Sequence, residues 1–455
     1  MEKTKVALVG LGTVGTGVAR LLLEFGDRAA RHAGRKLWLE QVVVADVNKP
    51  RGIDLPAGIL SDDLTRITRD PEITAVALLV GGLEPARTIA LKLLESGKDL
   101  ITANKALLAE HGPELFDRAR ELGRSIAFEA AVAGGIPIIA NISQCLSANQ
   151  IQSIDAILNG TSNFILTKME AEETAYSEAV RQAQQLGYAE ADPSMDVDGS
   201  DAAQKLAILA HLAFGVRVSW RNIPRRGIDK LEVADLRFAK ELGYHIKLMA
   251  VARLTKTGLE LHVSPTLVKR GTPLAEVRGA YNAISVVGDA VGRVFFSGLG
   301  AGAMPTASAV MADMIDTVVG RTAITFRRLE LWADKSSHGE RSSREGRCLP
   351  GEPGALAESD PANVAGRYYL RFNVADRPAV LAEIAGVLGR HKISIASVIQ
   401  HDSEGRGETT ERQEATVPLM IMTHQTTEGA VGRALESIDQ MEFLRGGSVR
   451  MRVLN

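Results

Sequence analysis

The feature that most constrains the fold of this chain is a glycine-rich turn near its N-terminus. A short apolar run, Lys5 to Val9, leads into Gly10-x-Gly12-x-x-Gly15, after which apolar residues recur at the spacing of a helix. In such a unit Gly10 permits the turn, Gly12 lets the backbone approach a pyrophosphate, and Gly15 lets the helix pack close to its strand. Glycine turns also occur without a nucleotide, but the position of this one between a strand and an amphipathic helix predicts dinucleotide binding.

The alternation of strands and helices continues through residues 1–136. Buried-strand patterns cover Gln41 to Ala45, Thr74 to Val80 and Asp99 to Thr102, and helices are predicted from Pro85 to Gly97 and from Pro113 to Gly123. Alternating elements of this length predict an α/β fold, a Rossmann-type, doubly wound parallel sheet that binds NAD(P).

Three later regions have different patterns. Residues 137–300 mix extended segments with an Ala-rich helix from Asp201 to Phe214, which predicts an α+β substrate-binding, catalytic and dimerisation domain, and residues 300–330 return to the first domain. Residues 333–366 are rich in small, charged and turn-forming residues and predict a linker. Residues 367–455 predict a ferredoxin-like βαββαβ domain. Its predicted strands are Tyr368 to Val374, Ile393 to Ile399, Thr416 to Met422 and Val449 to Leu454, with helices around Val380 to Leu388 and after Thr426.

Composition narrows the classes of function. The chain has 53 Lys and Arg residues against 55 Asp and Glu residues, so no global field attracts nucleic acid. No apolar run approaches the roughly 18 residues of a membrane helix, and no signal-peptide pattern opens the chain. Two cysteines, Cys145 and Cys348, are too few for a disulfide framework. We therefore expect a cytoplasmic protein that binds neither nucleic acid nor membrane.

The densest group of chemically active residues runs from Glu190 to Lys205 and ends in an acid and a lysine four residues apart. Asp201 and Lys205 share one face of the predicted helix, one step round from its apolar stripe, so both should be half buried. An exposed ion pair is the structural alternative to a catalytic pair. A second lysine, Lys105, follows the strand that ends at Thr102, at the sheet edge where ligands bind, although it could also be an ordinary first-turn lysine.

Asp46 ends the second predicted strand. Its carboxylate could accept a hydrogen bond from a ribose 2′-hydroxyl or could form a turn. Lys49 and Arg51 could neutralise a 2′-phosphate or lie in solvent, so NAD and NADP both stay open. His211 and His245 have no partner carboxylate nearby in sequence and are predicted to be packing residues.

Taken together, these motifs resemble homoserine dehydrogenase. The matching segments are the glycine turn, Thr102 to Lys105, Asn159 to Asn163, Asp192 to Lys205 and Gly300 to Thr306, in this order within residues 1 to 330. The third domain resembles an ACT domain, with Asp376-Arg377-Pro378 before its first helix and Gly389 near the end of that helix. No aspartate kinase portion is present, so the chain resembles the monofunctional form.

The resemblance implies reversible reduction of L-aspartate 4-semialdehyde to L-homoserine by NADPH or NADH, on the path to threonine, methionine and isoleucine. It implies Lys205 as the proton donor to the aldehyde oxygen, Lys105 as a neighbour of the nicotinamide, and Asp201 as a third catalytic residue. Substrate binding is assigned to Glu190, Asp201 and Asp196. The expected cofactor contacts are Gly10, Gly12, Thr13, Val14, Gly15, Asp46, Lys105 and Gly302.

The resemblance also implies a structural sodium ion, an amino-acid effector and a homo-oligomer, either a dimer or a tetramer. Sodium would be held by Glu129 and the carbonyls of Val132, Gly134 and Ile136, an oxygen-only set that suits a hard cation. Threonine is the expected effector of the ACT domain.

Two departures qualify the resemblance. Ala45 stands before Asp46 where NADP-preferring members often carry arginine, and Ala379 stands where a glycine is common in the ACT loop. A dehydrogenase of another amino-acid semialdehyde and a non-catalytic amino-acid and dinucleotide sensor are the alternative functions.

Overall fold

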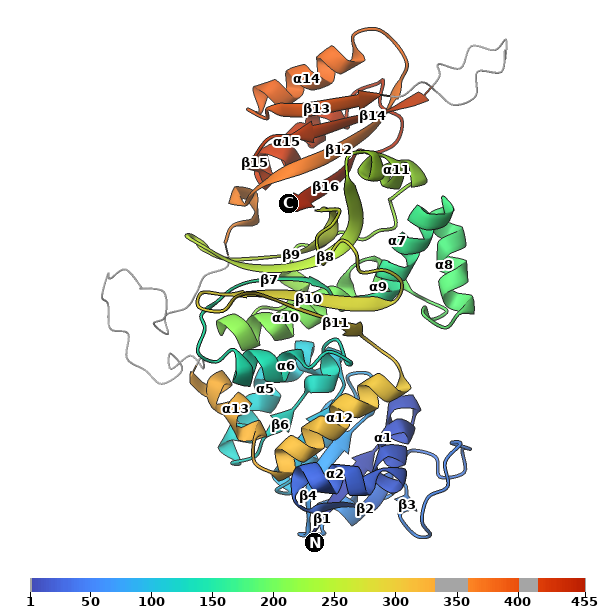
Figure 1. The fold of residues 1–455 in the computed structure, drawn as a ribbon, viewed down its shortest axis with the longest axis vertical. Coiled ribbons are helices and arrows are strands. Elements are labelled where there is room, and N and C mark those ends of the chain that lie inside the picture. Colours follow the sequence, from blue (N-terminus) through green and yellow to red (C-terminus); the bar gives the residue numbers. More distant parts are fainter. Residues whose placement is uncertain (1, 332–358, 401–415, 455) are drawn as a thin grey trace, which may run out of the picture. The chain divides into compact units, whose positions relative to one another are not determined.

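The computed structural model describes residues 2–331, 359–400 and 416–454, so most of the predicted linker and Cys348 lie outside the described residues (Figure 1). Two compact units are formed. The first comprises residues 1–154, 201–223 and 280–356, and the second comprises residues 155–200, 224–279 and 357–455, each as far as it is described. None of the described helices is long and apolar enough to cross a membrane.

The first unit is built on a six-stranded parallel sheet, which confirms the predicted doubly wound fold. The strand order is β3-β2-β1-β4-β5-β6, in which the chain order reverses next to β1. The strands are β1 (Lys3–Val9), β2 (Lys36–Val43), β3 (Leu60–Ser61), β4 (Ile73–Leu78), β5 (Asp99–Thr102) and β6 (Ile126–Ala127). Strand β2 therefore begins and ends earlier than the strand predicted from Gln41 to Ala45.

Helices complete this unit, together with the antiparallel hairpin of β10 (Tyr281–Gly288) and β11 (Gly292–Leu299). Helix α12 packs on α1, where a Cβ built on Gly17 would lie only 2.9 Å from that of Ala307, and it adds Val310 and Met314 to the core around β1. The helices are α1 (Thr13–Glu24), α2 (Gly26–Ala33), α3 (Thr65–Thr68), α4 (Ala86–Glu95), α5 (Lys105–Glu121), α6 (Ile138–Ala140), α10 (Ser200–Phe214), α12 (Ala303–Val318) and α13 (Thr322–Leu331).

The helix predicted to start at Pro113 is longer than its sequence signals suggested. It begins at Lys105 as α5, and Pro113 lies inside it. The Asn104 side chain caps the true N-terminus by accepting a hydrogen bond from the backbone N–H of Leu107 at 3.0 Å. The proline removes one backbone hydrogen bond, but the buried Leu115 and Phe116 that follow keep this part of the helix on the core. The prediction of a helix start at Pro113 is therefore wrong.

The second unit contains the strands β8 (Tyr244–Thr255) and β9 (Gly258–Lys269) and the C-terminal βαββαβ domain. The latter has β12 (Ala365–Ala375), α14 (Val380–Arg390), β13 (Ile395–Gln400), β14 (Thr416–Thr423), α15 (Glu428–Ile438) and β16 (Val449–Leu454), which confirms the predicted order. Strand β12 begins three residues before the predicted Tyr368. Strand β7 (Ile151–Ile157) crosses the boundary between the units, and α7 (Gly160–Glu172), α8 (Tyr176–Gln185), α9 (Ser194–Val197) and α11 (Val233–Glu241) belong to the second.

Strand β16 joins the C-terminal domain to β9. It pairs in parallel with β9 through Arg452, Val453 and Leu454 and antiparallel with β12, so β8, β9, β16, β12, β14 and β13 are consecutive in one sheet (Figure 1). Helices α14 and α15 bury Ile384, Val387, Val431 and Ile438 in a core shared with the domain's strands. The C-terminal strand is thus bound to a strand of another domain through backbone hydrogen bonds, a link that no local pattern had predicted.

Candidate active site and cofactor site

Two lysines from different helices meet on one buried carboxylate in the first unit. The Nζ atom of Lys205 lies 2.8 Å from Asp201 Oδ2, and the Nζ atom of Lys105 lies 2.7 Å from Asp201 Oδ1. The Asp201 side chain is 4% exposed and that of Lys205 is 12% exposed, whereas that of Lys105 is 38% exposed. The pair predicted to be half buried is thus deeper than expected, and Lys105 joins it.

The electrostatics of this cluster keep its carboxylate ionised. Burial by itself raises the pKa of Asp201, but the ammonium groups of Lys205 and Lys105 outweigh burial and hold that pKa well below its usual range. One negative charge is therefore shared between two positive charges, which leaves a net positive cluster next to solvent on the Lys105 side.

Local hydrogen bonds place Lys105 at the carboxyl edge of the parallel sheet. The Asn104 side chain donates to the carbonyl of Val80 at 3.0 Å and to that of Gly82 at 2.6 Å, in addition to capping α5. The Thr102 hydroxyl donates to the carbonyl of Leu78 at 3.2 Å. The end of β5 is thereby tied to the end of β4, so the first residue of α5 has a defined position.

The glycine turn lies beside a cavity of about 1100 Å³ at the same edge of the sheet. Gly10 has a φ of +100°, and a Cβ there would lie 2.7 Å from the carbonyl oxygen of Leu79. A Cβ on Gly15 would overlap the Gly10 carbonyl, whereas Gly12 faces open space at the N-terminus of α1. Thr13 also lines the cavity, and Val14 packs partly buried against the core. The turn therefore leaves room for phosphates where the N–H groups of α1 begin.

Asp46 lines this cavity and also forms a turn. Its Oδ1 atom accepts a hydrogen bond from the backbone N–H of Asn48 at 2.9 Å. Arg51 donates to the main-chain carbonyls of Asp46 and Lys49, and both basic residues line the cavity. The geometry is thus compatible with both roles considered for Asp46, as an acceptor for a ribose hydroxyl and as a turn-forming residue. The basic residues Lys49 and Arg51 line the same cavity.

Glu190 and Asp196 belong to the second unit. Glu190 is exposed, and Asp196 accepts a hydrogen bond through Oδ1 from the side chain of Asn159 at 2.7 Å. Asn159 caps α7, and Ser162 donates to the main-chain carbonyl of Asp196 at 2.8 Å. Residues 159–163 therefore build a buried polar network that holds Asp196 in place.

Gly302 precedes α12 with a φ of +129°, a conformation that favours glycine. A Cβ on its neighbour Gly300 would overlap the side chain of Asn282. Close packing explains Gly300 without a ligand, whereas at Gly302 a Cβ would meet only Pro305, at 3.4 Å, so the backbone conformation is what requires glycine there.

The proposed cation loop offers a partial set of ligands. The Glu129 carboxylate already accepts hydrogen bonds from the backbone N–H groups of Ile139 and Ala140, both at 2.8 Å. The Ile136 carbonyl accepts one from Ile138 N–H at 2.7 Å. Burial raises the pKa of Glu129 to about 7, and a bound cation would favour its ionised form. The Glu129 carboxylate and the Ile136 carbonyl, two of the four ligands that the resemblance implies, are therefore already engaged in hydrogen bonds within the loop.

Two histidines behave differently from each other. Burial lowers the pKa of His211 to about 4, as expected for a packing residue. His245 is buried too, but its Nδ1 atom lies 2.6 Å from Glu170 Oε1. This partner comes from another element of the second unit, so no sequence spacing could have revealed it.

The comparisons with known proteins agree with this geometry. Residues 10–129 match the family model for the NAD binding domain of homoserine dehydrogenase, residues 137–315 match the model for homoserine dehydrogenase, and residues 368–442 match the ACT domain. The homoserine dehydrogenase of Pseudomonas aeruginosa is 40% identical, with 100% of this chain and 99% of the relative covered. This chain belongs to the homoserine dehydrogenase family. It is therefore an NAD(P)-dependent oxidoreductase with a C-terminal ACT domain.

Other homoserine dehydrogenases extend the likeness. The protein of Synechocystis is 40% identical, and 99% of each chain is covered. A homoserine dehydrogenase crystal structure from Thiobacillus denitrificans has a TM-score of 0.85 at 38% identity and covers 100% of this chain and 99% of its own. A hyperthermophilic archaeal homoserine dehydrogenase mutant, solved in complex with NADPH, has a TM-score of 0.58 at 26% identity over 70% of this chain and 98% of its own.

Proposed function

We propose that this homoserine dehydrogenase reduces L-aspartate 4-semialdehyde reversibly to L-homoserine in the biosynthesis of threonine, methionine and isoleucine, with Lys205 as the proton donor. The observation that carries the proposal is the contact of Lys205 and Lys105 with the two oxygens of Asp201. A positive cluster of this kind at the ligand-binding edge of the sheet suits a reaction in which negative charge develops on an oxygen.

The roles of the lysines follow from the charge that the reaction creates. A reduced nicotinamide, when bound, supplies the hydride. As the aldehyde carbon is reduced, its oxygen gains negative charge, which the Lys205 ammonium stabilises before donating a proton to that oxygen. The amine left on Lys205 then regains a proton from solvent. Lys105, the more exposed of the two, would hold the same oxygen against the cofactor.

Asp201 positions both ammonium groups. Because its carboxylate stays ionised and each oxygen contacts one lysine, it sets the separation of the two nitrogens. Glu190 and Asp196 remain the proposed partners of the substrate's α-ammonium group, for which their carboxylates have the right charge.

Replacement of Lys205 tests the mechanism. We expect Lys205→Ala to lower kcat for homoserine oxidation by about 10³-fold or more, while the dissociation constant of NADPH changes little. Absorbance of the reduced nicotinamide gives the rate, and its fluorescence gives the binding. Lys92→Ala, at an exposed position of α4, serves as the control and should keep wild-type activity. Near-normal turnover by Lys205→Ala would remove Lys205 from the mechanism.

For the cofactor we propose that NADP and NAD both bind, with Asp46 facing the ribose and Lys49 and Arg51 able to meet a 2′-phosphate. Their place in the lining of the large cavity supports this arrangement. Steady-state rates with each cofactor test it. Arg51→Ala should raise KM for NADP roughly tenfold and KM for NAD by less than twofold, because only NADP carries the additional charge. Equal effects on both would place Arg51 away from the 2′-position.

We further propose that the ACT domain makes the enzyme sensitive to threonine and that the chain forms a homo-oligomer. Strand β13 is the last strand of its sheet among the described residues, and exposed side chains such as Val398 lie along it, so it offers an edge for pairing with a second copy. Light scattering during size-exclusion chromatography tests the assembly. A monomeric mass at micromolar concentration would contradict it.

A further inference from the structure

A second cavity, of about 220 Å³, lies in the second unit beside the pairing of β9 and β16. One wall is β9 with Glu260, His262 and Ser264, and Arg450 and Arg452 on β16 form another. Residues 224–226, which precede α11, form a third wall of the cavity, and the backbone N–H of Arg226 donates a hydrogen bond to the carbonyl of Val263 at 2.9 Å. The cavity is therefore made jointly by the ACT domain and the strand to which it is bound.

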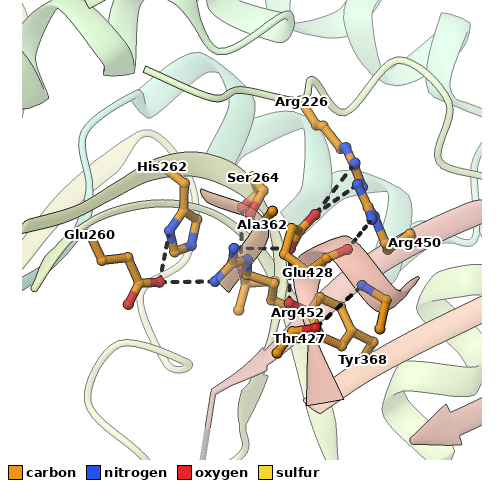
Figure 2. Close-up of polar contacts among 12 residues, drawn as sticks. Arg226, Glu260, His262, Ser264, Ala362, Tyr368, Thr427, Glu428, Arg450 and Arg452 are labelled. Atoms are coloured by element: carbon orange, nitrogen blue, oxygen red, sulfur yellow. Dashed lines mark hydrogen bonds and ion pairs between the residues drawn. The ribbon is translucent and has the colours of Figure 1, made fainter. Parts of the chain in front are cut away.

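One carboxylate in this cavity has its full set of partners. Figure 2 shows Arg226, Arg450 and Arg452 converging on Glu428, the first residue of α15. Their guanidinium nitrogens lie 3.6, 2.7 and 2.9 Å from its oxygens, and the hydroxyl of Tyr368 donates to Oε2 at 2.9 Å. Glu428 therefore belongs to the framework of the cavity and has no need of a ligand.

Other polar atoms of the lining are incompletely paired. The Nε atom of Arg450, whose side chain is 10% exposed, and the Oγ atom of Ser264 are buried and have no hydrogen-bond partner within the described part of the chain. Both contacts of Glu260, from Arg452 at 2.9 Å and from His262 at 3.3 Å, use Oε1, so Oε2 accepts nothing from the described residues. A buried donor without an acceptor destabilises the folded state, and a ligand atom that accepts its hydrogen bond offsets this cost.

The charge of the lining favours a ligand that carries an anionic group. Arg226, Arg450 and Arg452 share two glutamates, Glu260 and Glu428, and burial lowers the pKa of His262, which keeps this imidazole neutral. These groups together leave one positive charge in excess. A guanidinium binds a carboxylate through paired, charge-assisted hydrogen bonds, whereas an ammonium group fits the unused oxygen of Glu260.

We propose that this cavity is a binding site for a small α-amino acid. Its carboxylate would lie against Arg450 and Arg226, and its ammonium group against Glu260 Oε2, with Ser264 available to a side-chain hydroxyl. The volume is below the roughly 300–1000 Å³ of pockets for drug-sized ligands, which excludes a dinucleotide. An inorganic anion would leave Glu260 Oε2 without a donor. The inference rests on the proposed threonine sensitivity and assigns it a site other than the loop of Asp376 and Ala379.

Binding at this place would couple the ACT domain to the strand β9. The ligand would contact β9 through Glu260 and Ser264 and β16 through Arg450, and these two strands are joined by the pairing of residues 266–268 with 452–454 and by the contact of Arg452 with Glu260. A ligand that binds both strands stabilises their pairing by its differential affinity for the paired state. Effector concentration would thereby act on a strand that is outside the ACT domain.

Calorimetric titration of the full-length protein with L-threonine tests the site. We expect binding that is weakened about tenfold or more in Arg450→Gln and about threefold to fivefold in Ser264→Ala, which removes one hydroxyl and little else. L-threoninamide, which lacks the carboxylate, and L-lactate, which lacks the ammonium group, should not bind. Arg390→Gln, an exposed arginine on α14, is the matched control and should bind L-threonine like the wild type.

The outcomes separate this site from the ACT loop and from the proposed reaction. Loss of L-threonine binding in Asp376→Asn, together with wild-type binding in both Arg450→Gln and Ser264→Ala, would place the effector at the loop and overturn the proposal. Absence of binding of L-threonine, L-isoleucine and L-methionine to the wild type would also overturn it. Homoserine oxidation measured in the same samples reports on the proposed reaction independently.

Discussion

Asp201 and Asp235 are both buried carboxylates that contact cations, yet their surroundings differ. Asp201 contacts two lysines, one of which is 38% exposed. Asp235 contacts Arg371, whose side chain is 2% exposed, and also accepts hydrogen bonds from Tyr369 and from the backbone N–H of Glu232. The first cluster is open, because it has a cation that a substrate can reach. The second is closed in the sense that its cation, Arg371, is buried, although Glu232, which lies 3.0 Å from Arg371, is 56% exposed.

The pKa shifts of the two carboxylates point in opposite directions because the balance between burial and neighbouring charges differs. Burial raises the pKa of Asp235 despite the opposing guanidinium of Arg371, while two ammonium groups keep the pKa of Asp201 low. Asp235 links α11 to β12, so its contacts serve the packing of the ACT domain. The comparison teaches that a buried ion pair becomes a candidate for catalysis when it keeps an accessible excess charge, and that burial alone does not distinguish the two roles.

The largest expected effect is on stability at the closed cluster. Asp235→Ala leaves Arg371 buried without its main partner, so the free energy of unfolding should fall by about 3–5 kcal/mol. Urea unfolding followed by circular dichroism measures this change. Glu241→Ala removes an exposed carboxylate at the end of the same helix and should cost less than about 1 kcal/mol. A loss as small as that in Asp235→Ala would show that the closed cluster is not structural.

The open cluster should respond in activity instead. Asp201→Asn keeps the shape of the side chain but removes the charge that positions both lysines, so kcat for homoserine oxidation should fall about 10²- to 10³-fold. Its thermal midpoint should fall less than that of Asp235→Ala. Asp198→Asn is the matched control, because among the described residues this exposed side chain accepts hydrogen bonds only from the backbone N–H and the hydroxyl of Ser200, at the start of α10. If Asp201→Asn unfolds as readily as Asp235→Ala and keeps its specific activity, the distinction between the two clusters fails.

Glu129 extends the comparison to a buried carboxylate with hydrogen bonds from backbone N–H groups and no ion pair among the described residues. Burial raises its pKa to about 7, above the unfolded value of about 4.5. Its contribution to stability is therefore present in full below pH 4.5 and is lost as the pH rises through about 7. The wild type should lose about 2–3 kcal/mol more stability than Glu129→Gln between pH 5 and pH 8.

The stability of the wild type in the presence of sodium gives a second test of Glu129. If the cation loop binds sodium, NaCl at pH 8 should restore part of the wild-type stability, because the cation favours the ionised form of Glu129. Choline chloride at the same ionic strength should not. Identical thermal midpoints in the two salts would remove the proposed sodium site.

The smallest expected effect concerns the ACT loop. Ala379 has a φ of +78°, a left-handed conformation that costs an L residue about 1–2 kcal/mol. Ala379→Gly should therefore stabilise the protein, by about 0.5–1 kcal/mol after the added flexibility of the unfolded chain is subtracted. Thermal unfolding measures the gain. A destabilised variant would show that the alanine side chain contributes packing that outweighs the strain.

The backbone conformation of Ala379 bears on one of the two departures from the resemblance. Alanine stands there in place of the common glycine, and the structure has retained the glycine-like backbone conformation. The loop geometry has therefore been kept at a cost. In contrast, the helix start predicted at Pro113 was wrong because a proline signal was weighed without the Asn104 cap nine residues earlier.

What the sequence determined by itself was the order of the elements and the local geometry of the site. The glycine turn, the end of β5 and the spacing of Asp201 and Lys205 on one helix face depend on periodicities of a few residues, which can be read without a structure. The tertiary structure alone decided which distant groups meet: Lys105 with Asp201, Arg371 with Asp235, and Arg450 with Glu428. Such contacts depend on strand register, as between β16 and β9, and register is set by the packing of whole domains rather than by neighbouring residues.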